Sequence, residues 1–92
     1  MKRGLVVCRT GMGSSMMLRI KLEQVISENN LDIDLEHDVL SAITNYDVDF
    51  VVTMNDLVDQ VKDDVKAVIG IEDLMNKEEL KAKLLDYLNK NQ

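Results

Sequence analysis

Residues 5–15 read Leu-Val-Val-Cys-Arg-Thr-Gly-Met-Gly-Ser-Ser. The segment opens with a short apolar and β-branched run, Leu5 to Val7, which is typical of a buried strand. It closes where apolar residues begin to recur at helical spacing, over Ser14 to about Asn29. Between the two lie the chain's single cysteine, Cys8, and a run of glycines and hydroxyl side chains. The sequence therefore predicts a strand, a tight polar loop and a helix.

Strand-like and helix-like stretches alternate through the remaining residues. Further strands are predicted at 33–37, 50–53 and 67–69, and further helices at 39–43, after Asn55 and after Asn76. Asp38, Asn55 and Asn76 are the expected N-caps of these helices. Asn76 with Glu79 three residues later resembles a capping box.

Connections of helix length between short apolar strands predict a parallel sheet with helices on both faces. The expected fold class is α/β, a three-layer αβα domain that spans residues 1–92 and is flavodoxin-like or Rossmann-like. Right-handed crossovers favour the strand order 2-1-3-4. That order puts a switch point, where ligands bind, at the carboxyl ends of the first and third strands. Cys8 ends the first strand and Thr53 the third, so the thiol is expected at the site.

Composition excludes several classes of protein. Hydrophobic residues make up 46% of the chain and charged residues 30%, which is typical of a globular domain rather than a disordered one. The longest apolar run, Leu5 to Cys8, is far shorter than the roughly 20 residues of a membrane helix or the about 7–15 of a signal peptide. One cysteine cannot form an internal disulfide. A cytoplasmic protein with no membrane segment of its own is therefore expected.

Charge is distributed unevenly along the chain. The net charge of −6 and the near absence of aromatic residues argue against a nucleic-acid partner. Residues 1–22, however, contain five basic side chains and no acidic one. The positive region thus surrounds Cys8, where it favours a bound anion.

The residues after Cys8 are those of an anion-binding loop. Glycines let several backbone N–H groups turn toward one point, hydroxyls add donors, and the helix that follows directs its positive end at the loop. The predicted phosphate-binding residues are Arg9, Thr10, Gly11, Met12, Gly13, Ser14 and Ser15. The same field is expected to lower the pKa of Cys8 and give a thiolate at neutral pH. The alternative is a structural cysteine that acts as a small buried hydrophobe.

Several phosphate chemistries fit this loop poorly. A nucleotide P-loop needs Gly-Lys-Ser/Thr, a dinucleotide site needs a third spaced glycine where Met16 stands, and a redox enzyme needs a second thiol. A low-molecular-weight cysteine phosphatase is the main alternative, but Ser14 occupies the position of its phosphate-clamping arginine. A third hypothesis is a non-catalytic module that binds a partner. No metal site and no cofactor are predicted.

Five segments together resemble the IIB components of the phosphoenolpyruvate-dependent sugar phosphotransferase system. They are the strand Leu5 to Val7, the loop Cys8 to Ser15, the helix Met16 to Glu28, the strand Asp49 to Thr53 and the tail Asn76 to Leu80. The resemblance covers nearly the whole chain and is greatest to the ascorbate-type, SgaB-like branch, close to the galactitol type. One departure is Arg9, which stands where a small residue is expected.

The resemblance implies a phosphoryl relay. A IIA partner would carry phosphohistidine, Cys8 would accept its phosphoryl group, and phospho-Cys8 would pass the group to a sugar held by the membrane permease IIC. The protein would then be a protein-phosphocysteine–sugar phosphotransferase that associates with the membrane through IIC.

Other residues have weaker claims on the site. Met12 and Met16 are expected to contact partners, because methionine adapts to different surfaces, although helix packing is an equal interpretation for Met16. Thr53 and Asn55 are expected to line the site on the side of the third strand. His37 is interpreted as a structural histidine at a strand end, with phosphoryl acceptance as the alternative.

Overall fold

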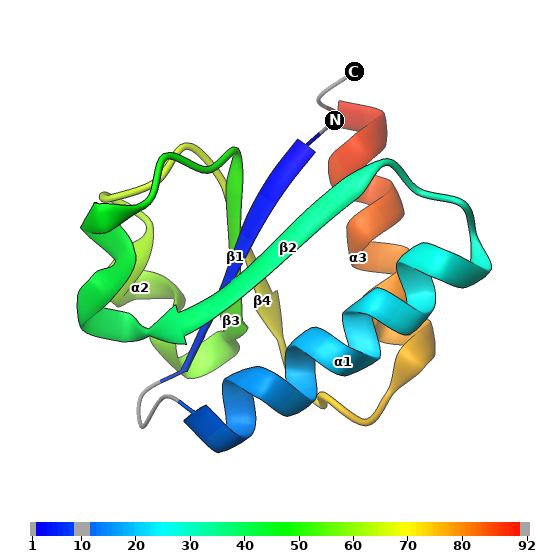
Figure 1. Ribbon diagram of the computed structural model, residues 1–92, viewed down its shortest axis with the longest axis horizontal. Coiled ribbons are helices and arrows are strands. Elements are labelled where there is room, and N and C mark those ends of the chain that lie inside the picture. Colours follow the sequence, from blue (N-terminus) through cyan, green and yellow to red (C-terminus); the bar gives the residue numbers. More distant parts are fainter. Residues whose placement is uncertain (1, 9–11, 91–92) are drawn as a thin grey trace.

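The computed structural model describes the backbone of residues 2–8 and 12–90 and the side chains of residues 2–8 and 16–90. Strands and helices alternate along this part of the chain (Figure 1). The elements are β1 (Lys2–Cys8), α1 (Met12–Glu28), β2 (Ile33–Val39), the 3-10 helix η1 (Leu40–Asn45), β3 (Phe50–Met54), the 3-10 helix η2 (Asn55–Leu57), α2 (Val58–Val61), β4 (Val68–Ile71) and α3 (Lys77–Lys90).

The strands form one parallel sheet in the order β2-β1-β3-β4, which confirms the predicted topology. Cys8 of β1 pairs with Val39 of β2, so these two strands end together. Val6 of β1 pairs with Val52 of β3. The chain leaves β1 toward one edge of the sheet and β3 toward the other. The switch point therefore lies at the carboxyl ends of β1 and β3.

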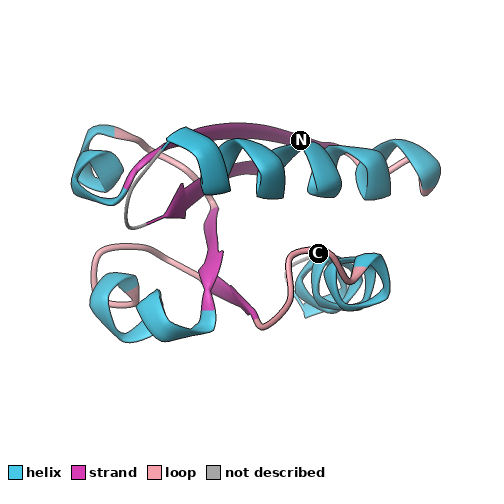
Figure 2. Ribbon diagram, turned by 90° about the horizontal axis from the view of Figure 1, so that it is seen from below, coloured by secondary structure: helices cyan, strands magenta, loops and turns pink. Residues whose placement is uncertain are grey.

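Helices cover both faces of this sheet and give three layers (Figure 2). The long helices α1 and α3 pack on one face, around a large apolar cluster that includes Val6, Phe50 and Leu84. The short helices η1 and α2 cover the other face, around a smaller cluster that includes Val7 and Val51. Successive residues of a strand point to opposite faces, which places Val6 and Val7 in different clusters.

Several boundaries differ from the prediction. β1 begins at Lys2 rather than Leu5, because the polar start of the strand pairs with β2 as regularly as its apolar end. α1 begins at Met12 rather than Ser14. The first backbone N–H groups of a helix have no intrahelical acceptor, so Gly13 can join the first turn without losing a hydrogen bond. The helix predicted after Asn55 is divided into η2 and the single turn α2.

Gly4 leaves room for an aromatic ring in the centre of the sheet. A Cβ atom at Gly4 would overlap Cζ of Phe50, and it would lie 2.6 Å from Cε2 of that ring and 2.9 Å from Cδ2 of Leu35. Phe50 is fully buried and stacks at a tilt on Tyr87 of α3, with 4.6 Å between ring centroids. The glycine therefore lets the ring of a neighbouring strand lie directly on the backbone of β1.

Asp38 fixes the connection from β2 to η1, although it does not cap the helix as predicted. Its Oδ1 accepts from the Val39 N–H at 2.7 Å, and its Oδ2 accepts from the Tyr46 hydroxyl at 2.6 Å. η1 begins one residue later than expected, and its N-cap residue, Val39, makes no side-chain cap. The hydrogen bond from Tyr46 holds the pKa of Asp38 below its ordinary value. The same bond raises the pKa of Tyr46.

Candidate functional site

Cys8 lies at the carboxyl end of β1, where the switch point meets the start of α1. Its side chain is 4% exposed. Three residues separate it from Met12, the first residue of α1, and the two elements approach each other at this end of the sheet (Figure 1). The first turn of α1 has backbone N–H groups without intrahelical acceptors and carries the positive end of the helix dipole. The thiol is thus placed beside a helix terminus that favours anions.

The protonation of this thiol differs from the prediction. Burial raises the pKa of Cys8, and the negative charge of Asp56 raises it further. The predicted thiolate at neutral pH is therefore wrong for the described part of the chain, where desolvation disfavours the charged form. The sequence showed the basic residues near Cys8 but not the depth of its burial.

Much of the predicted phosphate-binding loop falls outside the description. Arg9, Thr10 and Gly11 lie outside the described residues. Gly13, Ser14, Ser15 and Met12 belong to the first turn of α1, and their side chains are not described. The assignment of these seven residues to phosphate stays a prediction.

The end of β3 lies beside Cys8. Thr53 is fully buried, and its Oγ1 has no hydrogen-bond partner in the described part of the chain. It follows Val51 by two positions, so its side chain lies on the same face of the sheet, the face of the smaller apolar cluster. Cys8 stands two positions after Val6, so by the same rule its side chain lies on the opposite face of the sheet, the face of the large apolar cluster. The role of Thr53 as a wall of the site stays a prediction.

Asn55 and Asp56 begin η2 directly after β3. Asn55 does not cap this helix as predicted; the N-cap residue is Met54, which makes no side-chain cap. The Asn55 side chain lies over Gly70 of β4 instead, where a Cβ atom would overlap its Oδ1. Because Gly70 has no Cβ atom, there is room for the amide of Asn55 above it. Asp56, which the sequence predicts as an acidic residue in the first turn of its helix, lies in the first turn of η2, and its charge raises the pKa of Cys8.

His37 has a structural partner on α1. Its Nδ1 lies 2.9 Å from Nη1 of Arg19, and Nε of Arg19 lies 3.3 Å from Oε1 of Glu23. A guanidinium can only donate, so Nδ1 of His37 is the acceptor in this contact. The interaction ties β2 to α1 and agrees with the structural interpretation of His37.

Apolar side chains gather on the outer face of α1 near its beginning. Met16, Met17 and Ile20 are each a little under half exposed. The buried face of α1 carries Leu18 and Leu22, which belong to the large apolar cluster. Packing within this domain therefore does not account for Met16, one of the two methionines predicted to contact partners. The side chain of the other, Met12, is not described.

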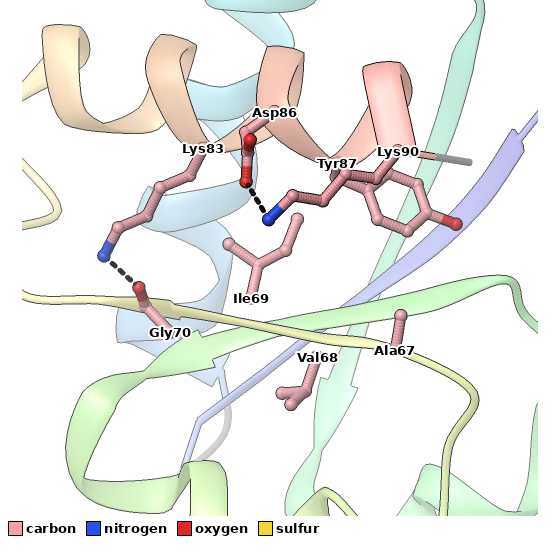
Figure 3. Close-up of a pocket in the computed structure, with 8 residues that line it drawn as sticks. All are labelled: Ala67, Val68, Ile69, Gly70, Lys83, Asp86, Tyr87 and Lys90. Atoms are coloured by element: carbon pink, nitrogen blue, oxygen red, sulfur yellow. Dashed lines mark hydrogen bonds and ion pairs between the residues drawn. The ribbon is translucent and has the colours of Figure 1, made fainter. Parts of the chain in front are cut away.

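A pocket of about 340 Å³ lies elsewhere, between the edge strand β4 and α3 (Figure 3). Its cationic groups are already engaged: Nζ of Lys83 contacts the Gly70 carbonyl, and Nζ of Lys90 lies 3.1 Å from Oδ2 of Asp86. The remaining wall is formed by Ala67 to Gly70 and by the ring of Tyr87. This pocket offers no unpaired charge for a phosphate and is separate from Cys8.

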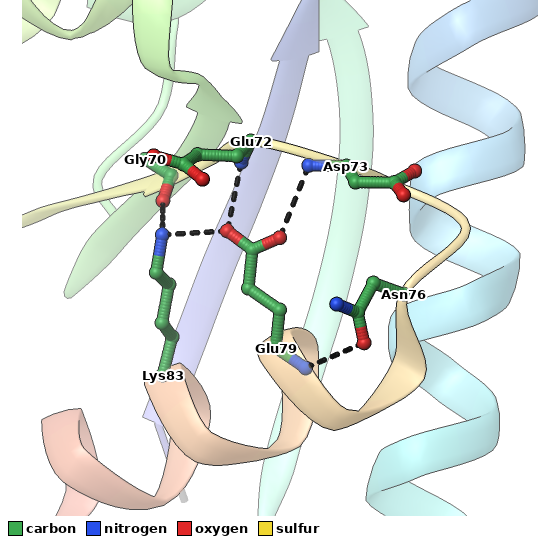
Figure 4. Close-up of polar contacts among 6 residues, drawn as sticks. All are labelled: Gly70, Glu72, Asp73, Asn76, Glu79 and Lys83. Carbon is green, nitrogen blue, oxygen red and sulfur yellow. Dashed lines mark hydrogen bonds and ion pairs between the residues drawn. The ribbon is translucent and has the colours of Figure 1, made fainter.

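The loop from β4 to α3 is closed by one carboxylate (Figure 4). Asn76 Oδ1 accepts from the Glu79 N–H at 3.2 Å, which confirms half of the predicted capping box. The Glu79 carboxylate does not return to Asn76; it accepts from the N–H groups of Glu72 and Asp73 at 2.8 and 3.0 Å and pairs with Lys83 at 2.7 Å. The backbone N–H of Asn76 already donates to the Asp73 carbonyl, so the carboxylate is free to hold the loop.

No group of three or more His, Cys, Asp or Glu side chains in residues 2–8 and 16–90 could hold a metal ion. Within the part of the chain that the structure describes, no helix has the length and apolarity needed to cross a membrane.

Comparison with known proteins places the chain in a class and then in a family. The fold is similar to that of the lactose-specific IIB component domain of the phosphoenolpyruvate:carbohydrate phosphotransferase system from Streptococcus pneumoniae, with a TM-score of 0.69 and 13% identity over 99% of this chain and 98% of that chain. The family model of the lactose/cellobiose-specific IIB subunit of the phosphotransferase system matches residues 3–86. The chain belongs to this family. A search of curated protein sequences finds no match.

This assignment confirms the predicted IIB class and corrects its branch. The ascorbate-type and galactitol-type branches, which five segments of the sequence suggested, are not supported; the matching family is the lactose/cellobiose type. The most specific of those segments was the Cys8 loop. A cysteine followed by glycines and hydroxyls reflects the demands of binding phosphate, which are the same whichever sugar is transported. Members of this family are phosphoryl carriers of sugar transport and act with IIA and IIC proteins.

Proposed function

We propose that Cys8 is the phosphoryl acceptor of this IIB domain. The observation that carries the proposal is the position of the thiol: the chain's single cysteine stands at the switch point, and three residues separate it from the first turn of α1, whose N–H groups have no intrahelical acceptor. In a flavodoxin-like sheet this is where ligands bind. A helix N-terminus is suited to hold the dianion of a phosphocysteine.

The reaction follows from this placement. The sulfur of Cys8 attacks the phosphorus of a phosphohistidine on IIA, an S–P bond forms and the P–N bond breaks. The thiol proton passes to the imidazole nitrogen that phosphorus leaves, so atoms and charge balance. In the second step a hydroxyl oxygen of the sugar attacks phosphorus, the S–P bond breaks, and the proton of that hydroxyl passes to the sulfur. The protein contributes alignment and charge compensation, which phosphoryl transfer chiefly requires.

The protonated thiol described above fits a carrier. A buried thiol that stays neutral between transfers resists oxidation and metal binding, because the thiolate is the reactive form. Deprotonation then belongs to the moment when the donor docks and its phosphoryl group approaches. A phosphatase would gain from a permanently ionised nucleophile and from an arginine where Ser14 stands.

The apolar patch on α1, formed by Met16, Met17 and Ile20, supports docking next to Cys8. The patch is exposed and lies in the same half of the helix as the terminus that faces the thiol. Lys21 lies on the same helix and favours a partner with an acidic group beside an apolar centre. IIA and the cytoplasmic part of IIC would use this surface in turn, with Met12 as a further contact. Because the family is described by lactose and cellobiose, disaccharides are the first sugars to test.

Intact mass spectrometry tests the proposal. The protein is incubated with phosphoenolpyruvate, the general phosphotransferase proteins and a lactose/cellobiose-type IIA, in parallel with Cys8→Ser. The wild-type protein should gain one phosphoryl group and the variant none. Absence of the gain with every IIA tried would reject the carrier function. Catalytic release of phosphate from an aryl phosphate would instead favour the phosphatase alternative.

A further inference from the structure

β4 is an edge strand whose outer side carries backbone hydrogen-bonding groups. It is the last strand in the order β2-β1-β3-β4 and has β3 as its neighbour. Val51 of β3 pairs with Val68, and the N–H of Val51 donates to the carbonyl of Ala67. In a parallel pair of strands this pattern turns the N–H and C=O groups of Val68 away from β3, and those of Gly70, two residues further on, with them. Val68 and Gly70 therefore present their backbone groups at the free edge of the sheet.

The two edges of the sheet differ in charge. β2, at the opposite edge, carries the exposed side chains of Asp34 and Glu36, and charged side chains of this kind keep the edges of two molecules apart. β4 has no charged residue from Val68 to Ile71, and its edge residues Val68 and Gly70 are partly exposed. A short uncharged edge strand is a template for pairing with another chain unless something covers it. Protection of β4 must therefore come from outside the strand.

Lys83 of α3 reaches this free edge. Its Nζ contacts the carbonyl oxygen of Gly70 and lies 2.7 Å from Oε2 of Glu79, as Figure 3 and Figure 4 show. The Glu79 carboxylate is itself held by the N–H groups of Glu72 and Asp73, which fixes the ammonium group beside the strand. The contact occupies a backbone acceptor that an added strand would use, and it places a positive charge at that point.

The hydrogen-bonding groups of the β4 edge are complementary to those of a second copy. If two copies met in antiparallel orientation with Ile69 opposite Ile69, Val68 of each copy would face Gly70 of the other. Both residues turn their N–H and C=O groups outward, so each facing pair could exchange two hydrogen bonds and join the two sheets into one. This pairing requires the Gly70 carbonyl of both copies, the group that Lys83 contacts.

We propose that Lys83 prevents two copies of the chain from pairing through their β4 strands. Pairing would break the contact between Lys83 and Gly70 in both copies and would bring two ammonium groups to the interface. Each hydrogen bond to a charged group that is lost weakens the dimer about tenfold, so the two together raise its dissociation constant about a hundredfold. This role of Lys83 does not depend on the function proposed for Cys8.

The test compares Lys83→Ala with Lys81→Ala by sedimentation velocity over a series of protein concentrations. Both changes remove one positive charge from α3 and introduce a good helix former, but Lys81 is exposed on the helix and serves as the matched control. The wild-type protein and Lys81→Ala should stay monomeric. Lys83→Ala should form dimers with a dissociation constant at least about a hundredfold lower than that of the wild-type protein. Lys83→Met, which keeps an apolar stem, should do the same, whereas Lys83→Arg keeps a cationic donor and should stay monomeric.

A second substitution identifies the surface that forms the dimer. Val68→Pro removes an outward N–H of β4 and leaves the hydrogen bonds to β3 in place. Combined with Lys83→Ala it should restore the monomer. In Lys83→Ala alone, hydrogen exchange of the Gly70 amide should slow as the protein concentration rises.

Far-UV circular dichroism identifies the variants that are folded, and either Lys83→Ala or Lys83→Met is sufficient for the comparison. Three results would each overturn the proposal: a wild-type protein that already dimerises, a folded Lys83 variant that sediments like Lys81→Ala at every concentration, and a dimer that persists after Val68→Pro.

Discussion

Replacing Thr53 by valine should make the domain more stable. Thr53 is fully buried at the end of β3, and its hydroxyl has no hydrogen-bond partner within the described residues. A buried hydroxyl that lacks a partner costs about 1–3 kcal/mol of stability. Valine has nearly the same shape, and its second methyl group would face the apolar cluster around Val51. We therefore expect the free energy of unfolding to rise by about 1–2 kcal/mol.

Urea and thermal unfolding followed by circular dichroism measure this change. For a domain of this size, 1 kcal/mol corresponds to a shift in Tm of about 4–8 °C. Thr53→Ser is the matched control, because it keeps the hydroxyl and removes the methyl group; it should lower the stability by about 1 kcal/mol. Both variants should unfold with the same dependence on urea concentration as the wild-type protein.

A loss of stability in Thr53→Val would refute this reasoning. It would mean that the hydroxyl is hydrogen-bonded in the folded protein, for which a buried water is the natural partner. The same variant also tests the predicted place of Thr53 in the site. If Thr53→Val is more stable and accepts phosphoryl groups from IIA as fast as the wild-type protein, the residue serves only the core.

Three further predictions concern the sheet, η1 and α1. Gly4→Ala should lower the free energy of unfolding by about 2–3 kcal/mol, since its Cβ overlaps an aromatic ring; an unchanged urea midpoint would contradict this. Tyr46→Phe should lower stability at neutral pH. Folding lowers the pKa of Asp38, so the hydrogen bond from Tyr46 to its carboxylate stabilises the fold above about pH 3.9 and this stabilisation is lost in acid. The free energies of unfolding of the wild-type protein and Tyr46→Phe should therefore converge as the pH falls. A difference that stays constant with pH would argue against this hydrogen bond. Met16→Asp should slow phosphoryl transfer from IIA at least tenfold without affecting folding. Ser27→Asp, about 16 Å further along α1, should not, and equal rates in the two variants would remove the patch from the docking surface.

The topology could be predicted because each strand and crossover left a local signal. Short apolar runs such as Val51 and its neighbours mark buried parallel strands, and the right-handed crossover rule restricts the order of the strands. The position of Cys8 at the switch point followed from that order alone. The single domain predicted for residues 1–92 stays a prediction.

The details that could not be predicted depend on tertiary contacts. Asparagine often caps helices, yet the side chain of Asn55 lies over Gly70, a residue distant in sequence. Glu79 has the spacing of a capping box, yet its carboxylate binds the loop before the helix. The predicted lowering of the Cys8 pKa was wrong because the sequence shows the basic residues near Cys8 but does not show that the thiol is buried.

The branch of the family illustrates a different limit. The sequence from Cys8 to Ser15 is predicted to bind a phosphoryl group, which is common to all sugars. The family model that matches residues 3–86 is that of the lactose/cellobiose type. The motifs of the sequence therefore indicated the IIB class correctly and its branch incorrectly.

The unequal covering of the two sheet faces has a consequence for dynamics. One face is covered by α1 and α3, of 17 and 14 residues, and the other by η1, η2 and the four-residue α2. Short helices with few buried side chains open locally at low free energy, so their amide protons should exchange with solvent well before those of β1 and α1. The stiff half of the domain is the half that presents the apolar patch on α1 and Cys8. A partner that docked there would meet a surface already in its bound conformation and would lose little conformational entropy, which would suit the proposed carrier, since it binds IIA and IIC in turn.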